Sequence, residues 1–325
     1  MVSSKYSQIS ANTAAAKLFL VIAAAITFGP VLSGGTLAEM SAASLGDTLA
    51  NKPIPIWSGG ALITQEGFGT TNPFFISYDR RGNTLGSVSF SIPGTSYLSV
   101  ADFSRATDGT VAVCGSATDA DGRTAPFIAW VSPDGKNTNV VRSAPYSPRK
   151  VTVGSDGAIW TVGFESMPND RDKANPAGFI FRRWDRSGKV SGAYFPQSRL
   201  KDARSVFSLD FLRSSKDRIA WYSTREGRYI ELSSTGTIVN DVSVDIPDPK
   251  VHIAGMALTD SGDVLIGRDY DRKWSILRLD FSASRWVEVE SSTSGHAFIY
   301  GSDGDLIVAR IGVKSGDFKF LELSR

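Results

Sequence analysis

The sequence predicts an all-β fold made of a repeated unit of four short strands. The unit recurs about every 45 residues as strand, tight turn, strand, polar loop, aromatic strand, second tight turn and Val-rich strand. The first turn appears as Asp108-Gly109, Asp156-Gly157, Lys216-Asp217, Ser261-Gly262 and Asp303-Gly304, and the second as Arg81-Gly82, Asp134-Gly135, Ser187-Gly188 and Thr235-Gly236. A fixed period of this length, with four strands in each period, is typical of a β-propeller.

Six such units follow one another after Lys52, so we expect a six-bladed β-propeller of four-stranded antiparallel blades. The clearest unit has strands at residues 100–106, 110–116, 126–131 and 138–142. Inner strands are also expected at 54–57 in the first unit and 206–212 in the fourth. The last unit supplies only three strands, at 296–300, 306–310 and 318–323. Residues 45–57 are expected to complete it, because sharing a strand between the chain ends closes the ring and removes an exposed edge.

Composition narrows the class of protein further. A chain of 325 residues could form two domains, but the continuous repeat favours one propeller domain over residues 53–325. The net charge is +2 with both signs interspersed, and no basic face is visible, which argues against a nucleic-acid partner. The 42% of hydrophobic residues is enough to bury a substantial core.

The N-terminus predicts export. Lys5 and Lys17 precede the apolar run at residues 18–28, and small residues follow between Ser33 and Ala38. This order is that of a secretory signal, and the apolar run is short for a membrane span. We expect residues 1–35 to be a signal peptide, or alternatively an uncleaved anchor, and residues 36–52 to be a polar spacer. The protein would then be secreted or periplasmic, or held at the membrane by its N-terminus alone.

Individual repeats resemble a known propeller class. Residues 153–163 (VGSDGAIWTVG), 257–267 (ALTDSGDVLIG) and 300–309 (YGSDGDLIVA) are similar to the repeats of NHL-type and streptogramin-lyase-like propellers. The resemblance covers most of residues 53–325 and implies a six-bladed architecture. It does not imply a reaction, because such folds host lyases, lactonases, binding modules and scaffolds alike. Related enzymes hold a divalent metal at the central channel, but no motif here carries such ligands over.

Candidate site residues lie where propeller geometry brings loops together. The connectors between units and the loops between second and third strands emerge on one face, around the channel mouth. His252 and His296 are both expected at the start of an inner strand in neighbouring units. The other candidates on this face are Arg149, Lys150, Arg204, Glu66, Glu165, Arg225, Arg268, Asp269 and Arg310. Such a cluster could bind an anion or a metal or act as acid and base, and polar side chains at a wet channel mouth are the simpler interpretation.

The remaining motifs favour structural roles. Cys114 lies in an apolar strand, so a buried thiol is expected rather than a reactive one. Residues 119–122 (DADG) begin like a calcium loop but lack its later Glu, which favours a plain turn. Residues 165–178 form the longest insertion and are expected to be a loop. The tryptophans expected in the core are Trp130, Trp160, Trp184, Trp221 and Trp274.

Two function classes follow from these observations. The first is an exported binding module whose channel face recognises a small molecule, a glycan or a protein. The second is a metal-dependent lyase or lactonase-type hydrolase using His252, His296 and either Glu165 or Glu66. No cofactor is evident from the sequence, although the second class leaves room for a divalent metal. A membrane-tethered scaffold is the third hypothesis, if the leader is retained.

Overall fold

The structure is a computed structural model that describes residues 37–43, 55–66, 70–168, 170–205, 210–244, 251–271, 273–312 and 318–323. All described residues belong to one compact unit, Gly34–Arg325. The predicted signal sequence therefore lies outside the described residues. None of the helices in the described part of the chain has the length and hydropathy of a membrane span.

The described strands form antiparallel four-stranded sets that follow one another along the chain. The first sheet contains β2 (Ile56–Ser58), β3 (Ala61–Glu66), β4 (Phe74–Tyr78) and β5 (Thr84–Ser89). The second contains β6 (Thr95–Arg105), β7 (Val111–Asp119), β8 (Thr124–Val131) and β9 (Thr138–Arg142). The third contains β10 (Tyr146–Val153), β11 (Ile159–Met167), β13 (Phe179–Trp184) and β14 (Val190–Pro196), with β12 (Asp170–Ala174) paired to β11. The fourth contains β15 (Phe211–Ser215), β16 (Arg218–Ser223), β17 (Arg228–Ser233) and β18 (Ile238–Ser243), and two short 3-10 helices, η1 (Gln197–Arg199) and η2 (Ala203–Ser205), precede it.

The last two sets are joined into one eight-stranded sheet. Its members are β19 (His252–Leu258), β20 (Val264–Tyr270), β21 (Lys273–Asp280), β22 (Arg285–Ser292), β23 (His296–Asp303), β24 (Leu306–Gly312), β25 (Phe318–Leu323) and β1 (Leu37–Ala43). A single parallel bridge, Gly255 opposite Ile299, connects β19 to β23. The prediction of six four-stranded blades is therefore wrong in its count, because the described strands form five sheets. Gly255 permits the bridge, since a side chain there would meet the backbone of β23.

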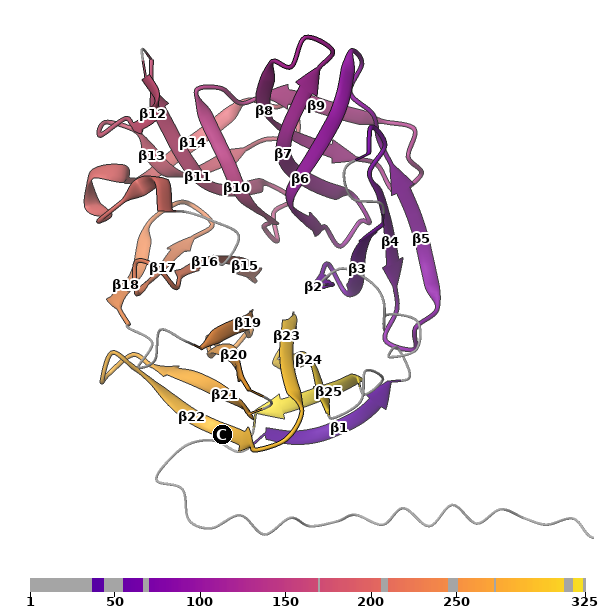
Figure 1. Ribbon diagram of the computed structural model, residues 1–325. Coiled ribbons are helices and arrows are strands. Elements are labelled where there is room, and N and C mark those ends of the chain that lie inside the picture. The colour runs from indigo at the N-terminus through magenta and orange to yellow at the C-terminus, as the bar shows by residue number, and fades with distance from the viewer. Residues whose placement is uncertain are drawn as a thin grey trace, which may run out of the picture. The chain divides into compact units, whose positions relative to one another are not determined.

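The sheets are arranged as a β-propeller. The innermost strands β2, β6, β10, β15, β19 and β23 contact one another in that order, and β23 returns to β2. Figure 1 shows these strands pointing toward a common centre within this unit. Among the described residues, one buried apolar cluster lies at each junction between successive four-stranded sets. The predicted core tryptophans Trp130, Trp160, Trp184, Trp221 and Trp274 are all buried. The stacking of sheets through apolar faces is what an all-β core requires.

Closure of the ring differs from the prediction in one respect. The two chain ends do share a sheet, since β1 pairs antiparallel with β25, with Leu37 opposite Leu323. The closing strand is Leu37–Ala43, however, and not residues 45–57 as expected. It lies within the segment predicted to be a polar spacer. An Ala- and Ser-rich stretch has weak strand propensity, so the pairing depends on backbone hydrogen bonds to the edge that β25 offers.

Two further segments differ from the prediction: the inner strand of the fourth sheet and the insertion at residues 165–178. The inner strand of the fourth sheet is Phe211–Ser215, a few residues later than predicted, and residues 206–209 lie outside the described part. The insertion at residues 165–178 is not a plain loop, because β12 folds back on the end of β11, with Ser166 opposite Ala174. Both departures arise at long connections between strands, where the repeat pattern does not fix the strand boundaries.

Aspartate side chains build many of the predicted turns. Asp185 accepts hydrogen bonds from the backbone N–H groups of Ser187 at 2.8 Å and Lys189 at 3.0 Å. A hydrogen bond from the Ser187 hydroxyl, followed by these backbone bonds, holds the pKa of the Asp185 carboxyl below its ordinary value. Gly188 then adopts φ +89°, which side chains other than glycine's rarely tolerate. The Asp–x–x–Gly pattern thus specifies the hairpin through its own backbone bonds.

Side chains link neighbouring inner strands around the ring. The backbone N–H of Arg105 donates to Ser58 Oγ at 2.8 Å, and the Asp102 carboxylate accepts from the N–H of Val151 at 3.0 Å. Ser214 Oγ donates to the carbonyl of Val153 at 2.7 Å. Further links run from Arg213 Nε to the Met256 carbonyl at 3.1 Å and from Ser302 Oγ to the Leu258 carbonyl. These bonds satisfy backbone groups of the inner strands, and they make the centre of the ring polar.

Candidate functional site

A cavity of about 200 Å³ lies where the inner strands end, and we call it the channel cavity. Its lining comes from β2, β6, β10, β15 and β23, together with the turn that follows β19. Hydroxyl groups dominate it: the lining contains Ser58, Ser104, Thr107, Thr152, Ser155, Ser214, Ser215 and Ser302. The site is therefore a polar pocket built on the rigid inner ring, at the face opposite to the predicted one.

The charged residues that line the channel cavity are Arg105, Arg213, Lys216, Asp260 and Asp303, and Lys216 lies 3.9 Å from Asp260. Arg105 donates through Nη1 to the carbonyl of Gly59 at 2.6 Å, and Arg213 donates through Nη1 to the carbonyl of Leu212 at 2.9 Å. Neither guanidinium forms an ion pair with any described carboxylate. The carboxylates in the lining already have partners, as Asp303 accepts from Arg80 Nε at 2.7 Å and Asp260 from Ser215. The two guanidinium groups are thus held in place by neutral carbonyls, and neither is directly paired with a carboxylate in the described part of the chain.

The pKa values reflect this arrangement. Burial lowers the pKa of Arg213, and the charge of Asp102 acts in the opposite direction. Burial likewise lowers the pKa of Arg105, with Asp108 opposing it. Both groups nevertheless stay protonated at neutral pH, since a guanidinium is not deprotonated in proteins. An anion in the cavity would relieve the cost of holding these charges away from water.

Behind the cavity lie three buried groups on neighbouring strands. Asp102 and Lys150 are 7% and 9% exposed, and Cys114 is fully buried. Burial raises the pKa of the Asp102 carboxyl, while Lys150 and Arg213 act to lower it. Burial, followed by the charge of Asp102, raises the pKa of the Cys114 thiol well above its ordinary value. Cys114 therefore remains a protonated core thiol, as predicted.

The predicted histidine pair lies at the opposite face, at the starts of two inner strands. His296 Nδ1 is 2.7 Å from Asp269 Oδ2, which links β23 to β20 of the neighbouring set. His252 is the register partner of Asp269 across β19 and β20. Directly opposite residues of an antiparallel pair project to the same side of the sheet. The structure therefore brings Asp269 together with both histidines, and the His296 side chain is 51% exposed.

The carboxylates proposed as partners of these histidines lie elsewhere. Glu165 is on β11 of the third sheet, where it accepts from Asn175 Nδ2 at 3.0 Å and pairs with Arg182. Its role is to hold the β11–β12 hairpin against β13. Glu66 is at the end of β3 in the first sheet, where it accepts from Thr64 Oγ1 at 3.5 Å. The contact seen in the structure joins His296 to Asp269 instead, and a catalytic combination of the histidines with Glu165 or Glu66 stays a prediction.

The predicted binding arginines are dispersed. Arg149 lies over the ring of Phe164, 5.5 Å from its centroid. Arg268 lies on β20, the strand that carries Asp269, and its Nε donates to Ser275 Oγ at 2.8 Å. Arg204 is in η2, on the connection to the fourth sheet. The structure does not gather them into one site. That they bind a ligand stays a prediction.

The described part of the chain contains no cluster of metal-binding side chains. No group of three or more His, Cys, Asp or Glu side chains there is arranged to hold a metal ion. The DADG segment forms a turn, in which Asp119 accepts from the N–H groups of Asp121 and Arg123, each at 2.9 Å. The calcium-like pattern is thus explained by a hairpin turn.

Sequence reasoning missed Arg105 and Arg213. Each lies on an inner strand, within three residues of the first turn of its unit. Attention to the second face of the propeller would have singled them out, since charged residues are costly on buried strands. The repeat pattern cannot reveal which end of the channel encloses a cavity, because that depends on the sizes of side chains contributed by several units.

Comparisons with known proteins bear on the fold. No protein-family model matches the chain, and no curated protein matches it. Among solved structures, a protein from Bacteroides fragilis with a name that describes it as exported has 13% identity and a TM-score of 0.51, over 91% of this chain and 97% of that chain. A virginiamycin B lyase from Staphylococcus aureus has 14% identity and a TM-score of 0.48, over 89% and 99%. A glucose dehydrogenase has 12% identity and a TM-score of 0.44, over 89% and 99%. At such low sequence identities, the similarity shows the architecture alone. The assignment of this chain as a β-propeller rests on the arrangement of its own strands.

Proposed function

We propose that this protein is a binding module that holds a small anionic molecule in the channel cavity. The observation that carries the proposal is the pair Arg105 and Arg213, both lining one cavity and both bound to carbonyls rather than carboxylates. A guanidinium bound to carbonyls keeps further N–H donors for a carboxylate, sulfate or phosphate. Ser214, Ser215 and Ser302 already donate to other groups, but the hydroxyls of Ser58, Thr107 and Ser155 in the same lining can add donors that suit these oxygens.

The size of the cavity limits the ligand. The volume of the cavity is about 200 Å³. Pockets for drug-sized ligands begin at about 300 Å³. An inorganic oxyanion or a small di- or tricarboxylate fits this space, whereas an oligosaccharide does not.

The test is a thermal-shift titration of the full chain with phosphate, sulfate, malonate and citrate, each against chloride at matched ionic strength. We expect at least one anion to raise Tm saturably, since a ligand at 100 times its Kd stabilises by about 2.7 kcal/mol. Arg213→Gln should weaken that anion at least tenfold, because a hydrogen bond to a charged group contributes about 1.5–3 kcal/mol.

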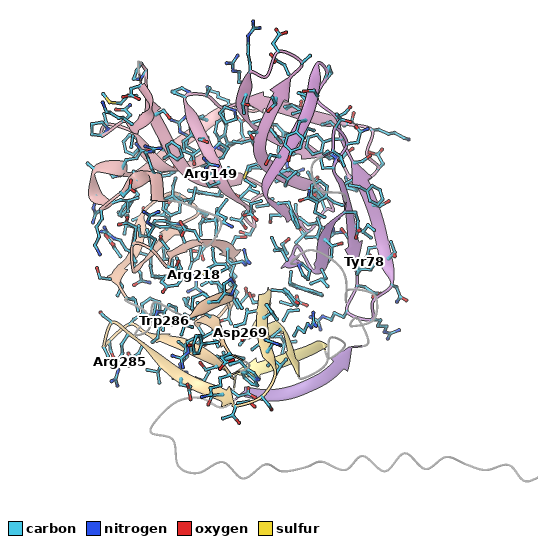
Figure 2. The ribbon with its side chains drawn as sticks, in the orientation of Figure 1. Tyr78, Arg149, Arg218, Asp269, Arg285 and Trp286 are labelled. Atoms are coloured by element: carbon cyan, nitrogen blue, oxygen red, sulfur yellow. The ribbon has the colours of Figure 1, made fainter. Side chains whose placement is uncertain are left out.

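The matched control is Arg285→Gln on β22, an exposed outer-strand position away from the centre of the ring (Figure 2). Its anion affinity should equal that of the unmodified protein. The Tm of each variant with an anion is compared with the Tm of the same variant without it. Arg105→Gln removes the other guanidinium of the pair and should weaken the same anion independently. The proposal is contradicted if no anion raises Tm saturably, or if Arg213→Gln binds the anion with unchanged affinity.

We further propose that the protein works outside the cytoplasm. The support is the order of residues at the N-terminus, where lysines precede the apolar run at 18–28 and small residues follow it. Recovery of a mature protein that begins between residues 34 and 43 would support cleavage of a leader. A retained N-terminus would favour the membrane-tethered form.

A second candidate, a hydrolase or lyase, is favoured by the contact between His296 and Asp269. A carboxylate 2.7 Å from an imidazole nitrogen orients the ring for general acid–base work. Hydrolysis of dihydrocoumarin, an aromatic lactone, with and without added Mg²⁺ or Mn²⁺ tests this candidate. If the candidate holds, His296→Gln should lower the rate by a factor of about 10²–10⁴, and Asp269→Asn should also lower it. A wild-type rate equal to the uncatalysed rate removes this substrate class.

A further inference from the structure

Two grooves lie side by side on the face opposite to the channel cavity. They measure about 710 and 450 Å³, and they share the residues Thr124, Pro126 and Arg142. The larger groove extends over the ends of β7 and β9 and the residues before β6, and the smaller one over the starts of β10 and the end of β11. The three shared residues form a wall between the two grooves. Together the grooves form one depression across the second and third sheets.

The larger groove has mainly apolar walls, and the smaller one is lined by apolar and polar residues in similar measure. The larger groove is lined by Ile92, Pro93, Ala117, Phe127 and Val140, and the smaller by Pro145, Phe164, Met167 and Pro168. Val140 and Met167 are each 38% exposed, which is a large fraction for side chains of their size. Apolar side chains gathered in a hollow, rather than scattered singly, are typical of an interaction site.

The charge of the depression is positive. Arg142 is exposed at the end of β9, and its side chain makes no hydrogen bond or ion pair with any described residue. Arg123 pairs with Asp121 at 3.1 Å, and both side chains are well exposed. Asp119 is the acidic residue among the described lining, but its carboxylate is directed into its own turn. The cation on the shared wall is thus available to an incoming carboxylate.

We propose that this depression binds an extended peptide that carries an acidic side chain between apolar ones. Alternate side chains of an extended chain project to the same side. A Glu or Asp can then meet Arg142 at the shared wall while apolar neighbours on either side enter the two grooves. A bidentate arginine–carboxylate contact fixes the register of the peptide, and the apolar contacts supply area. This site is separate from the channel cavity, so the two proposals stand or fall independently.

The experiment is selection of a displayed library of random octapeptides on the full-length protein. We expect enriched sequences to contain Asp or Glu flanked by Leu, Ile, Met, Phe or Pro. Replacing the acidic residue of the strongest peptide by Gln or Asn should weaken binding about tenfold or more. Arg142→Gln should cause a similar loss for the acidic peptide and almost none for its neutral analogue. Such a pattern identifies a pairwise interaction rather than a general loss of affinity.

Two control variants separate the groove from the rest of the surface. Met167→Glu places a charge in the smaller groove, where an apolar side chain of the peptide is expected, and should also weaken binding, whereas Arg285→Gln should leave it unchanged. All three positions are exposed, so folding is expected to persist and can be checked by Tm. The proposal is overturned if selection enriches no sequence, if enriched peptides lack acidic residues, or if they bind Arg142→Gln with unchanged affinity.

Discussion

Replacing Gly255 by alanine is expected to lower Tm by about 10 °C, corresponding to about 4 kcal/mol in the free energy of unfolding. An ideal Cβ at this position would lie 1.7 Å from the carbonyl oxygen of Ile299, and the residue has φ +120°. The added methyl group must therefore push β19 away from β23 or distort both strands. Because the obstacle is backbone, no side-chain rotation can relieve it.

A matched glycine separates the two causes of this effect. Gly135 has φ +70° in an open turn, where an added Cβ meets nothing within 4 Å. Gly135→Ala should therefore report backbone strain alone, about 1 kcal/mol. Urea unfolding of both variants gives the difference, and hydrogen exchange should show faster opening of β19 and β23 only in Gly255→Ala. Equal losses in the two variants would show that the β19–β23 bridge adds nothing to stability.

Replacing Glu231 by alanine is the second change with a large expected effect, a loss of about 4 kcal/mol. Glu231 is 1% exposed on β17, where its carboxylate accepts from Tyr229 Oη at 2.8 Å and Asn240 Nδ2 at 3.0 Å. Arg218 Nη1 lies 3.4 Å from the same group. Alanine would remove the acceptor and leave a largely buried arginine without its counter-charge. Burial, followed by Glu231, raises the pKa of Tyr229, so its hydroxyl remains a donor.

A double-mutant cycle tests the origin of that loss. Arg218 also donates to the carbonyls of Thr259 and Asp260, each at 3.0 Å, so it joins β16 to the next set of strands. If the unpaired charge of Arg218 causes most of the loss, Glu231→Ala should lower the free energy of unfolding less in an Arg218→Met background than in the native background. Tyr229→Phe, which deletes one hydrogen bond, should cost only about 1 kcal/mol. Additive effects of the two charge deletions would exclude coupling between Arg218 and Glu231.

Local chemistry made the turns predictable. Asp185 and Gly188 act through backbone hydrogen bonds and φ values that involve only neighbouring residues, so their pattern identifies the hairpin before any tertiary contact is known. The tryptophans were likewise placed correctly, since large apolar side chains on alternating strands have no stable position other than the sheet interfaces.

Long-range pairing was not predictable in the same way. β1 lies more than 270 residues from its partner β25, and its Ala- and Ser-rich composition contains no sign of that partner. The bridge at Gly255 depends on the distance between β19 and β23, which is set by the curvature of the whole ring. Strand pairing between distant segments uses backbone groups that every residue possesses, so side-chain patterns specify it weakly.

The sequence by itself determined the class of fold, the position of most strands and turns, and the burial of Cys114 and the tryptophans. It also brought forward His252, His296 and Asp269, which the structure places together. Only the tertiary structure decided that Glu165 belongs to a hairpin of another sheet and that Arg105 and Arg213 share a cavity. The physical reason is that strand and turn signals are local, whereas a site is a meeting of side chains from several sheets. Their distances depend on how the whole ring closes.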